Sequence, residues 1–207
     1  MKYIPLIIEN GIVNEHFGKT RNRVYILCID DRGYFLRSDY IPLGEMQHVL
    51  AALTPANRLV CEVSLMTGLR LGDVLNMRSA RLAERMTIRE LKTGKSRRVR
   101  IPVELLNRMH AIKGKIYVFE GRTDPKKHRS RAAVYKDIKR AAKLFRLDKR
   151  LQVSPHSLRK IWSVEQLRRH GGNIHKVQEL LQHENEAVTM LYAMADALTA
   201  AKLSKRG

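Results

Sequence analysis

The spacing of apolar and polar residues changes period several times along the 207-residue chain. Near the N-terminus, "RVYILCI" and "YFLRSDYI" are rich in β-branched and aromatic residues and flank the turn-forming "DDRG", which predicts a β-hairpin over residues 22–42. Over 42–70 the apolar residues recur at three- and four-residue spacing, which predicts two helices with a proline-containing break at 54–56. Gly68 is placed to end the second helix, and "LGDVLNM" predicts a short helix after it.

The middle of the chain predicts a small antiparallel sheet, and the last third predicts helices. In "MTIRELKTGKSRRVRIPV", two β-prone runs flank "KTGKS", which predicts a hairpin with Gly94 in its turn, and "KIYVFEG" predicts a strand at 115–121. The turn-rich, basic "GRTDPKKHRS" then predicts a loop. Helices are predicted at 103–112, 130–147, 153–172, 173–183, 185–195 and 197–205. This order indicates an α+β, mostly α-helical domain.

Composition is that of a folded protein, because 44% of the residues are hydrophobic. No apolar run approaches the roughly 18–20 residues that span a bilayer, and the N-terminus lacks a small-residue cleavage site for secretion. Cys28 and Cys61 lie in apolar runs, which indicates free thiols, and the cysteines and histidines show no metal-ligand spacing. We therefore expect a cytoplasmic protein with no metal site and no membrane partner.

Charge is distributed unevenly. The chain has 40 Lys and Arg against 20 Asp and Glu, a net charge of +20, and residues 89–150 hold 21 basic and 6 acidic groups, a net charge of +15. A concentrated block of this kind favours a polyanion held against one face. Charge alone also fits a ribosomal or other RNA-binding basic protein.

Five short motifs follow one another in a specific order. They are "TGLRLGDVL" with Arg70, "LKTGKSRRVRIP" with Lys92, "PHSLRK" with His156 and Arg159, "LLQH" with His183, and Tyr192 in "VTMLYAMAD". Over about residues 43–195 this order resembles the catalytic domain of tyrosine recombinases, the phage-integrase and Xer-like family. The resemblance implies the tyrosine-recombinase catalytic-domain fold with its small antiparallel sheet. It also implies cleavage and rejoining of DNA through a covalent 3′-phosphotyrosine.

The chemistry of phosphodiester cleavage is consistent with this resemblance. Without a metal or other cofactor, the reaction needs a nucleophile, stabilisation of charge on the phosphorane, and a proton for the leaving oxygen. Tyr192 supplies a phenol, and the planar guanidinium groups of Arg70 and Arg159 match the non-bridging phosphate oxygens.

The remaining catalytic roles come from the resemblance alone. It implies that Lys92, on a mobile hairpin, enters the minor groove and protonates the departing 5′-hydroxyl. His156 and His183 would contact the scissile phosphate and help to move the phenolic proton. Asp73 matches the family's acidic position that steadies the site. Lys95 lies near the same hairpin tip, but Lys92 directly before Thr-Gly fits the family pattern better.

Each of these residues has an ordinary structural explanation when it is taken singly. A tyrosine on an apolar helical face usually packs in a core, "KTGKSRR" could be a solvated turn or a nonspecific phosphate clamp, and arginines often cap helices or pair with carboxylates. Together they would require five coincidences in family order, which favours catalysis. We also expect cationic side chains of the basic block to contact DNA: Lys95, Arg97, Arg98, Lys126, Lys127, Arg129, Arg131, Lys136, Lys139 and Arg140.

The chain departs from the family pattern at several positions. Gln182 stands where the family usually has Gly, Ser157 lies inside the His-x-x-Arg motif, and acidic residues follow His183. The expected organisation is a short β-like extension at 1–42, with no room for the family's usual core-binding domain, a catalytic domain at 43–196, and a tail helix at 197–207 that could pack on a neighbouring subunit.

The resemblance implies a site-specific recombinase of a phage or mobile element, acting in integration and excision or in DNA inversion. It also implies a monomer in solution, a tetramer on two DNA sites, and an accessory DNA-bending or directionality protein. The host would be prokaryotic, with the protein in its cytoplasm near the nucleoid, or the chain would be phage-encoded. Two alternatives stay open, a type IB topoisomerase-like enzyme and a DNA-binding regulator whose catalysis is weak or lost.

Overall fold

The computed structural model describes residues 7–9, 12–14, 38–145, 147, 149–182, 189 and 192–204. The chain divides into two compact units, Met1–Arg37 and Ser38–Gly207. In the first unit, β1 (Ile7–Glu9) and β2 (Ile12–Asn14) pair antiparallel. Most of the hairpin predicted at 22–42 lies outside the described residues.

The described end of that predicted hairpin, 38–42, forms no strand and belongs to the second unit. The backbone N–H of Asp39 donates to the carbonyl of Gln152 at 2.8 Å, and that of Tyr40 donates to Oγ1 of Thr199 at 3.0 Å. Ile41 is fully buried. The structural boundary therefore lies at 37/38, before the boundary predicted at residue 42.

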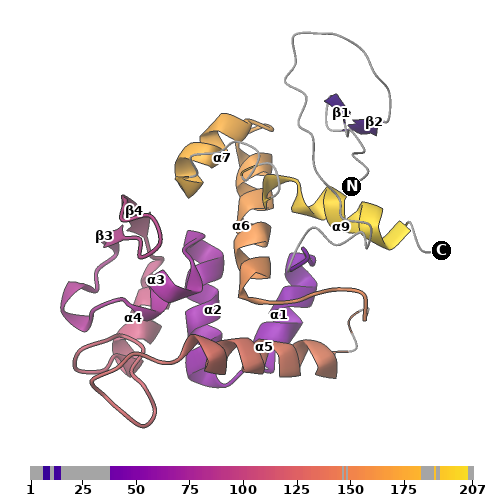
Figure 1. The fold of residues 1–207 in the computed structure, drawn as a ribbon. Helices are drawn as coiled ribbons and strands as arrows, with labels where there is room; N and C mark the ends of the chain where they lie inside the picture. Colours follow the sequence, from indigo (N-terminus) through magenta and orange to yellow (C-terminus); the bar gives the residue numbers. More distant parts are fainter. Residues whose placement is uncertain are drawn as a thin grey trace. The chain divides into compact units, whose positions relative to one another are not determined.

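Helices dominate the second unit (Figure 1). In chain order they are α1 (Leu43–Ala51), α2 (Pro55–Thr67), α3 (Leu71–Leu75), α4 (Val103–Ile112), α5 (Arg131–Leu144), α6 (Pro155–Arg169), α7 (Ile174–Leu181) and α9 (Ala195–Ser204), with a 3-10 turn at Ser79–Arg81. The described part of the chain therefore confirms the predicted mostly helical α+β class. No described helix has the length and apolar content that a membrane span needs.

The predicted central hairpin is confirmed. β3 (Arg85–Arg89) pairs antiparallel with β4 (Ser96–Arg100), and Gly94 in the turn has a φ of 68°. One face of each strand points inward, so that Ile88 on β3 and Val99 on β4 are buried. The hairpin lies at one edge of the second unit, beside α3 (Figure 1).

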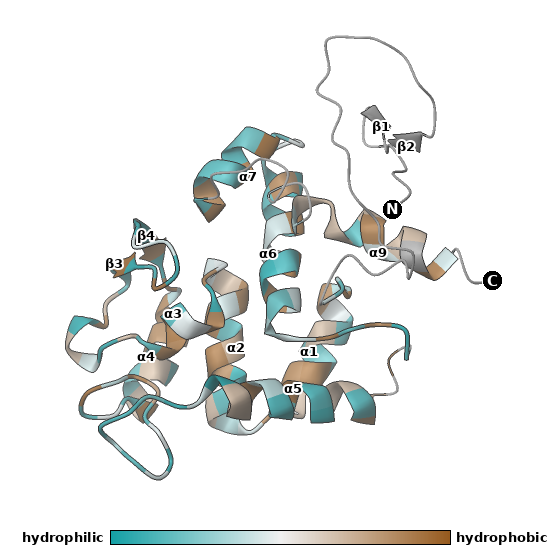
Figure 2. Cartoon of the chain, in the orientation of Figure 1, coloured by the Kyte–Doolittle hydropathy of each residue, from teal (hydrophilic) through white to brown (hydrophobic). Residues whose placement is uncertain are grey.

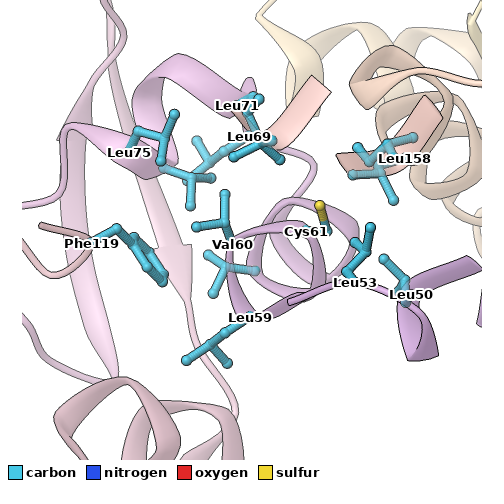
Figure 3. Packing of buried hydrophobic residues seen from close by; sticks show 14 of the residues in the cluster. Leu50, Leu53, Leu59, Val60, Cys61, Leu69, Leu71, Leu75, Phe119 and Leu158 are labelled. Atoms are coloured by element: carbon cyan, nitrogen blue, oxygen red, sulfur yellow. The ribbon is translucent and has the colours of Figure 1, made fainter. Parts of the chain in front are cut away.

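The core is built around α2, which packs against α1, α3, α4 and α6. Figure 3 shows Val60 and Cys61 of α2 among leucines from α1, α3 and α6 and beside Phe119. Full burial of one such side chain contributes about 1.5–3 kcal/mol. In Figure 2 the helices carry both hydrophobic and hydrophilic residues, as amphipathic packing requires.

A buried carboxylate fastens α5 to the start of α2. Asp137 accepts hydrogen bonds from the backbone N–H and the hydroxyl of Thr54, both at 3.0 Å, from Nδ2 of Asn57 at 2.8 Å, and from Arg140. Burial raises the pKa of this carboxyl, but the bonds from Arg140, Asn57 and Thr54 outweigh it and bring the pKa to about 2. This contact fixes the direction of α5 and so the place of its basic face.

The prediction of a strand at 115–121 is wrong. Among the described residues this segment makes only isolated bridges, Arg78 with Tyr117 and Glu120 with His128, because no described strand runs alongside it. Val118 and Phe119 are buried in the core, and their backbone groups bond to loop residues instead of a ladder. A short apolar run therefore marked a buried loop.

Candidate active site

The site is organised around the C-terminal end of α2. Gly68, at a φ of 67°, ends the helix and turns the chain so that Arg70 occupies the N-cap position of α3. A Cβ at position 68 would lie less than 3.0 Å from the ring of Trp162, so glycine is required here for both conformation and space. The "TGLR" motif is thus the turn that places Arg70.

Two buried guanidinium groups hold this turn by donating hydrogen bonds to its carbonyl oxygens. Arg159 of α6 is 2% exposed and donates to the carbonyl of Gly68 and, at 3.2 Å, to that of Leu181. Arg97 of β4 is 7% exposed and donates to the carbonyls of Thr67 at 2.6 Å and Gly68 at 3.4 Å. A helix C-terminus carries partial negative charge, which favours cations at this position.

Arg70, Arg97 and Arg159 influence one another electrostatically. Burial and the nearby Arg70 and Arg97 lower the pKa of Arg159 to about 10. Burial also lowers the pKa of Arg97 to about 10, with Arg70 adding to the effect. Both groups stay cationic at neutral pH, so the site concentrates positive charge where an anion could bind.

Two buried carboxylates face this cluster and fasten the hairpin to it. Glu90 accepts a hydrogen bond from Nη1 of Arg70 and another from the hydroxyl of Thr93 at 3.0 Å. Asp73 accepts one from the backbone N–H of Leu91 at 2.8 Å. Burial raises the pKa of Asp73, and the negative charge of Glu90 adds to that rise. These contacts hold the turn that carries Lys92, whose side chain is exposed.

His156 and Tyr192 contact each other close to Arg159. Nδ1 of His156 is 3.2 Å from Oη of Tyr192, and the guanidinium carbon of Arg159 is 5.9 Å from the centre of the tyrosine ring. Ser154 and Ser157 form a capping box at the start of α6, which sets the direction of the histidine. Burial, and then the positive charge of Arg159, lower the pKa of His156, so the imidazole is neutral at pH 7.

Tyr192 and Ala193 have helical backbone, and the tyrosine ring packs half-buried on a second apolar cluster that contains Trp162 and Leu181. The structure therefore brings Arg70, Asp73, His156, Arg159 and Tyr192 around the end of α2. His183 lies outside the described residues.

The predicted DNA-contacting cations fall into different surroundings. Arg97, which was predicted to contact DNA, is buried, and its guanidinium donates to the carbonyls of Thr67 and Gly68. Arg140 is paired with Asp137, and Arg129 is half-buried with Nη1 donating to Asn57 at 3.3 Å. The exposed side chains are Lys95, Arg98, Lys126, Lys127, Arg131, Lys136 and Arg140, and Lys139 is half-exposed beside Gln152.

Sequence reasoning missed Glu90, although a signal was present. In a strand, alternate residues face the same side. Glu90 continues the inward positions of β3 after Ile88, and Arg97 shares the inward face of β4 with Val99. The hairpin pattern could therefore have placed both charged groups inside.

Comparison with known proteins gives one consistent result. Residues 41–198 match the Phage integrase family. A tyrosine recombinase of Thermosipho africanus (strain TCF52B) is 28% identical over 165 residues, which are 74% of this chain and 56% of that protein. The chain thus spans little more than half the length of this relative.

Solved structures share the fold. A lambda integrase (residues 75–356) dimer bound to a COC' core site matches with a TM-score of 0.64 and 18% identity, covering 77% of this chain and 60% of that one. XerA recombinase matches with a TM-score of 0.60 and 22% identity, covering 82% and 64%. XerH bound to a palindromic difH substrate matches with a TM-score of 0.62 and 15% identity, covering 83% and 54%.

Proposed function

The chain belongs to the phage integrase family, and on that premise we propose that it is a site-specific DNA recombinase of a phage or mobile element with Tyr192 as its nucleophile. The observation that carries the proposal is the contact between Tyr192 and His156 at 3.2 Å, next to the buried guanidinium of Arg159. A tyrosine that only filled a core would need neither partner.

The proposed reaction begins with the phenol. In the tautomer protonated on Nε2, Nδ1 of His156 accepts the phenolic hydrogen, and Oη of Tyr192 attacks the scissile phosphorus. Arg70 and Arg159 stabilise the charge on the non-bridging oxygens of the phosphorane. The bond from phosphorus to the 5′ oxygen then breaks, and Lys92 gives that oxygen its proton. The product is a 3′-phosphotyrosine and a free 5′-hydroxyl.

The remaining assignments belong to the same proposal. His183 would contact the scissile phosphate, and Asp73 would steady the hairpin through Leu91. The exposed cations of the basic block would contact the DNA backbone. Resealing reverses the same steps, so the reaction needs no metal and no nucleotide.

The proposed partner is double-stranded DNA, bound by a tetramer on two sites that assembles from monomers with an accessory DNA-bending protein. One structural relative is a lambda integrase tetramer on a Holliday junction, which supports this for that protein. Light scattering of the isolated chain tests the monomer, and a stable tetramer without DNA would count against it.

A covalent-capture experiment tests the function. The target site is first selected from a randomised duplex pool by keeping strands that stay attached to the protein after denaturation. A duplex of that site, nicked so that the cleaved fragment diffuses away, should give an adduct on a denaturing gel with the wild type and none with Tyr192→Phe. No adduct with either protein would refute the proposal in favour of a non-catalytic DNA-binding regulator.

A second assay separates recombination from topoisomerase activity. A supercoiled plasmid with two copies of the site should yield recombinant circles. Relaxation alone, without exchange between the sites, would assign the chain to topoisomerase-like activity instead.

The hairpin offers a matched pair of lysines. Both Lys92 and Lys95 are exposed near its tip, but only Lys92 lies between the two anchored residues Leu91 and Thr93. Lys92→Ala should therefore slow cleavage much more than Lys95→Ala in single-turnover assays. Equal effects, or the reverse order, would remove Lys92 from the role of proton donor.

A further inference from the structure

Gln182 has a backbone conformation that side chains rarely adopt. Its φ is 54° and its ψ is 35°, and among the described residues no other residue besides glycines has a positive φ. Gln182 ends α7 in the left-handed conformation, where glycine is the least strained residue. A strained residue of this kind persists only where its surroundings compensate for it.

The side chain of Gln182 has one unfavourable feature and one favourable contact. Its Oε1 is buried without a hydrogen-bond partner among the described residues. Its Nε2 donates to the backbone carbonyl of Ser96 at 2.8 Å, across 86 positions of sequence. A buried amide oxygen without a partner is unfavourable, so the bond to Ser96 is what the described structure gains from glutamine here.

This bond connects two parts of the site that lie far apart in sequence. Ser96 is the first residue of β4 and pairs with Arg89 across the hairpin that carries Lys92. Gln182 is the last described residue before His183, and the carbonyl of the preceding Leu181 accepts a hydrogen bond from Arg159. The end of α7 therefore contacts both the arginine cluster and the hairpin.

Besides the contacts of Glu90 and Arg97 described above, one hydrogen bond holds the hairpin on each side of its tip. On the entering side, Asp73 of α3 accepts from the backbone N–H of Leu91 at 2.8 Å, and on the leaving side Gln182 donates to Ser96 at 2.8 Å. Lys92 lies between these two anchors. Without the second anchor, β4 stays paired with β3, but the start of β4 loses its hydrogen bond to the end of α7.

We propose that Gln182 is a positioning residue that anchors the β3–β4 hairpin so that Lys92 delivers its proton to the departing 5′ oxygen. The inference rests on the proposed function, in which Lys92 is the proton donor. It assigns Gln182 no contact with DNA and no part in the attack by Tyr192.

Two substitutions separate the anchor from the backbone conformation. Gln182→Gly removes both the strain and the amide, whereas Gln182→Asn keeps an amide and tolerates the left-handed conformation but is one methylene too short to reach Ser96. We expect both to slow single-turnover cleavage by about tenfold to a hundredfold, the effect of a small misplacement of a catalytic group. Gln182→Gly should unfold at the same denaturant concentration as the wild type or at a higher one.

The decisive readout uses a duplex of the selected site in which sulfur replaces the bridging 5′ oxygen. When the bond from phosphorus to sulfur breaks, the leaving group departs as a thiolate and needs no proton, so a defect in proton delivery disappears. Lys92→Ala and both Gln182 variants should cleave this substrate within a few-fold of the wild-type rate, while His156→Ala stays slow.

The outcomes separate a failure of the role proposed for Gln182 from a failure of the proposed function. If Lys92→Ala recovers with the sulfur substrate and the Gln182 variants stay equally slow on both substrates, Gln182 does not act through the hairpin and the inference is wrong. Wild-type rates for both variants on ordinary DNA also overturn it. If Lys92→Ala does not recover, the role of Lys92 fails, and the inference fails with it.

Discussion

Replacing Gly68 with alanine tests how tightly the end of α2 is built. The residue has a φ of 67°, and a Cβ there would lie less than 3.0 Å from three ring atoms of Trp162. Trp162 is itself 8% exposed, and the centre of its ring lies 5.0 Å from the guanidinium carbon of Arg97. The ring therefore has little room to move away from a new Cβ. The substitution therefore combines a conformational cost with a steric one.

The two costs can be separated by a matched control. Gly171 has a φ of 59°, but a Cβ there would meet no atom within 4 Å, so Gly171→Ala carries the conformational cost alone. That cost is about 1 kcal/mol, and overpacking against a buried ring adds about 1–3 kcal/mol. With a urea m-value of about 2 kcal/mol/M, Gly68→Ala should lower the unfolding midpoint by about 1–2 M and Gly171→Ala by about 0.5 M.

Urea unfolding followed by circular dichroism measures both midpoints, and fluorescence of the single tryptophan, Trp162, reports on the same place. In a Trp162→Leu background the excess loss at Gly68 should shrink. Equal midpoint losses for the two alanine variants would show that the ring moves aside without cost. Because Gly68 carries the carbonyl to which Arg97 and Arg159 donate, we also expect Gly68→Ala to slow cleavage more than its control.

Three further predictions follow from the same contacts. The folded pKa of Asp137 is about 2, below its usual 3.8, so its contribution to stability is complete above about pH 4 and is lost as the pH falls towards 2. Asp137→Asn should flatten this part of the stability curve in urea titrations, and an unchanged acid limb would contradict the assignment. Glu90→Gln keeps the shape of the side chain but removes the negative charge that faces Arg70, so it should lower the free energy of unfolding by about 1–3 kcal/mol. An unchanged free energy of unfolding would mean that the Arg70–Glu90 pair is not formed. Because the pKa of His156 is lowered, the cleavage rate should stay near its plateau down to pH 6.5 and fall only below it, and an acid limb above pH 6.5 would require a different proton acceptor.

The elements that sequence predicted correctly are those with complete local signals. The helix at Val103–Ile112 and the hairpin around Gly94 are specified by residues within a few positions of one another. The segment 115–121 forms no strand because no described strand lies beside it to pair with, and a local pattern does not show whether such a partner exists. The N-terminal extension was predicted to end at residue 42, five residues after the structural boundary at 37/38. Residues 39 and 40 bond to Gln152 and Thr199, which lie far along the chain, so a local pattern could not show that they belong to the second unit.

The site divides in the same way. The motifs located Arg70, His156, Arg159 and Tyr192, since each lies in a short, recognisable stretch. The partners that hold two of them are distant in sequence: Glu90 is 20 positions from Arg70, and Gly68 is 91 positions from Arg159. Arg97 was predicted to contact DNA because it lies in a basic stretch, and that prediction did not use its alternation with Val99 along β4.

The choice of partners explains how the cluster keeps its charge. Arg97 and Arg159 are held by carbonyl oxygens at the ends of α2 and α7, while Glu90 pairs with the more exposed Arg70. A carbonyl orients a guanidinium without adding a negative charge beside it, whereas a carboxylate offsets part of the positive charge that attracts a phosphate. Helix C-termini supply such carbonyls in fixed directions. A buried arginine held in this way stays cationic and aligned before any DNA arrives, which is the form of preorganisation that stabilises a charged transition state.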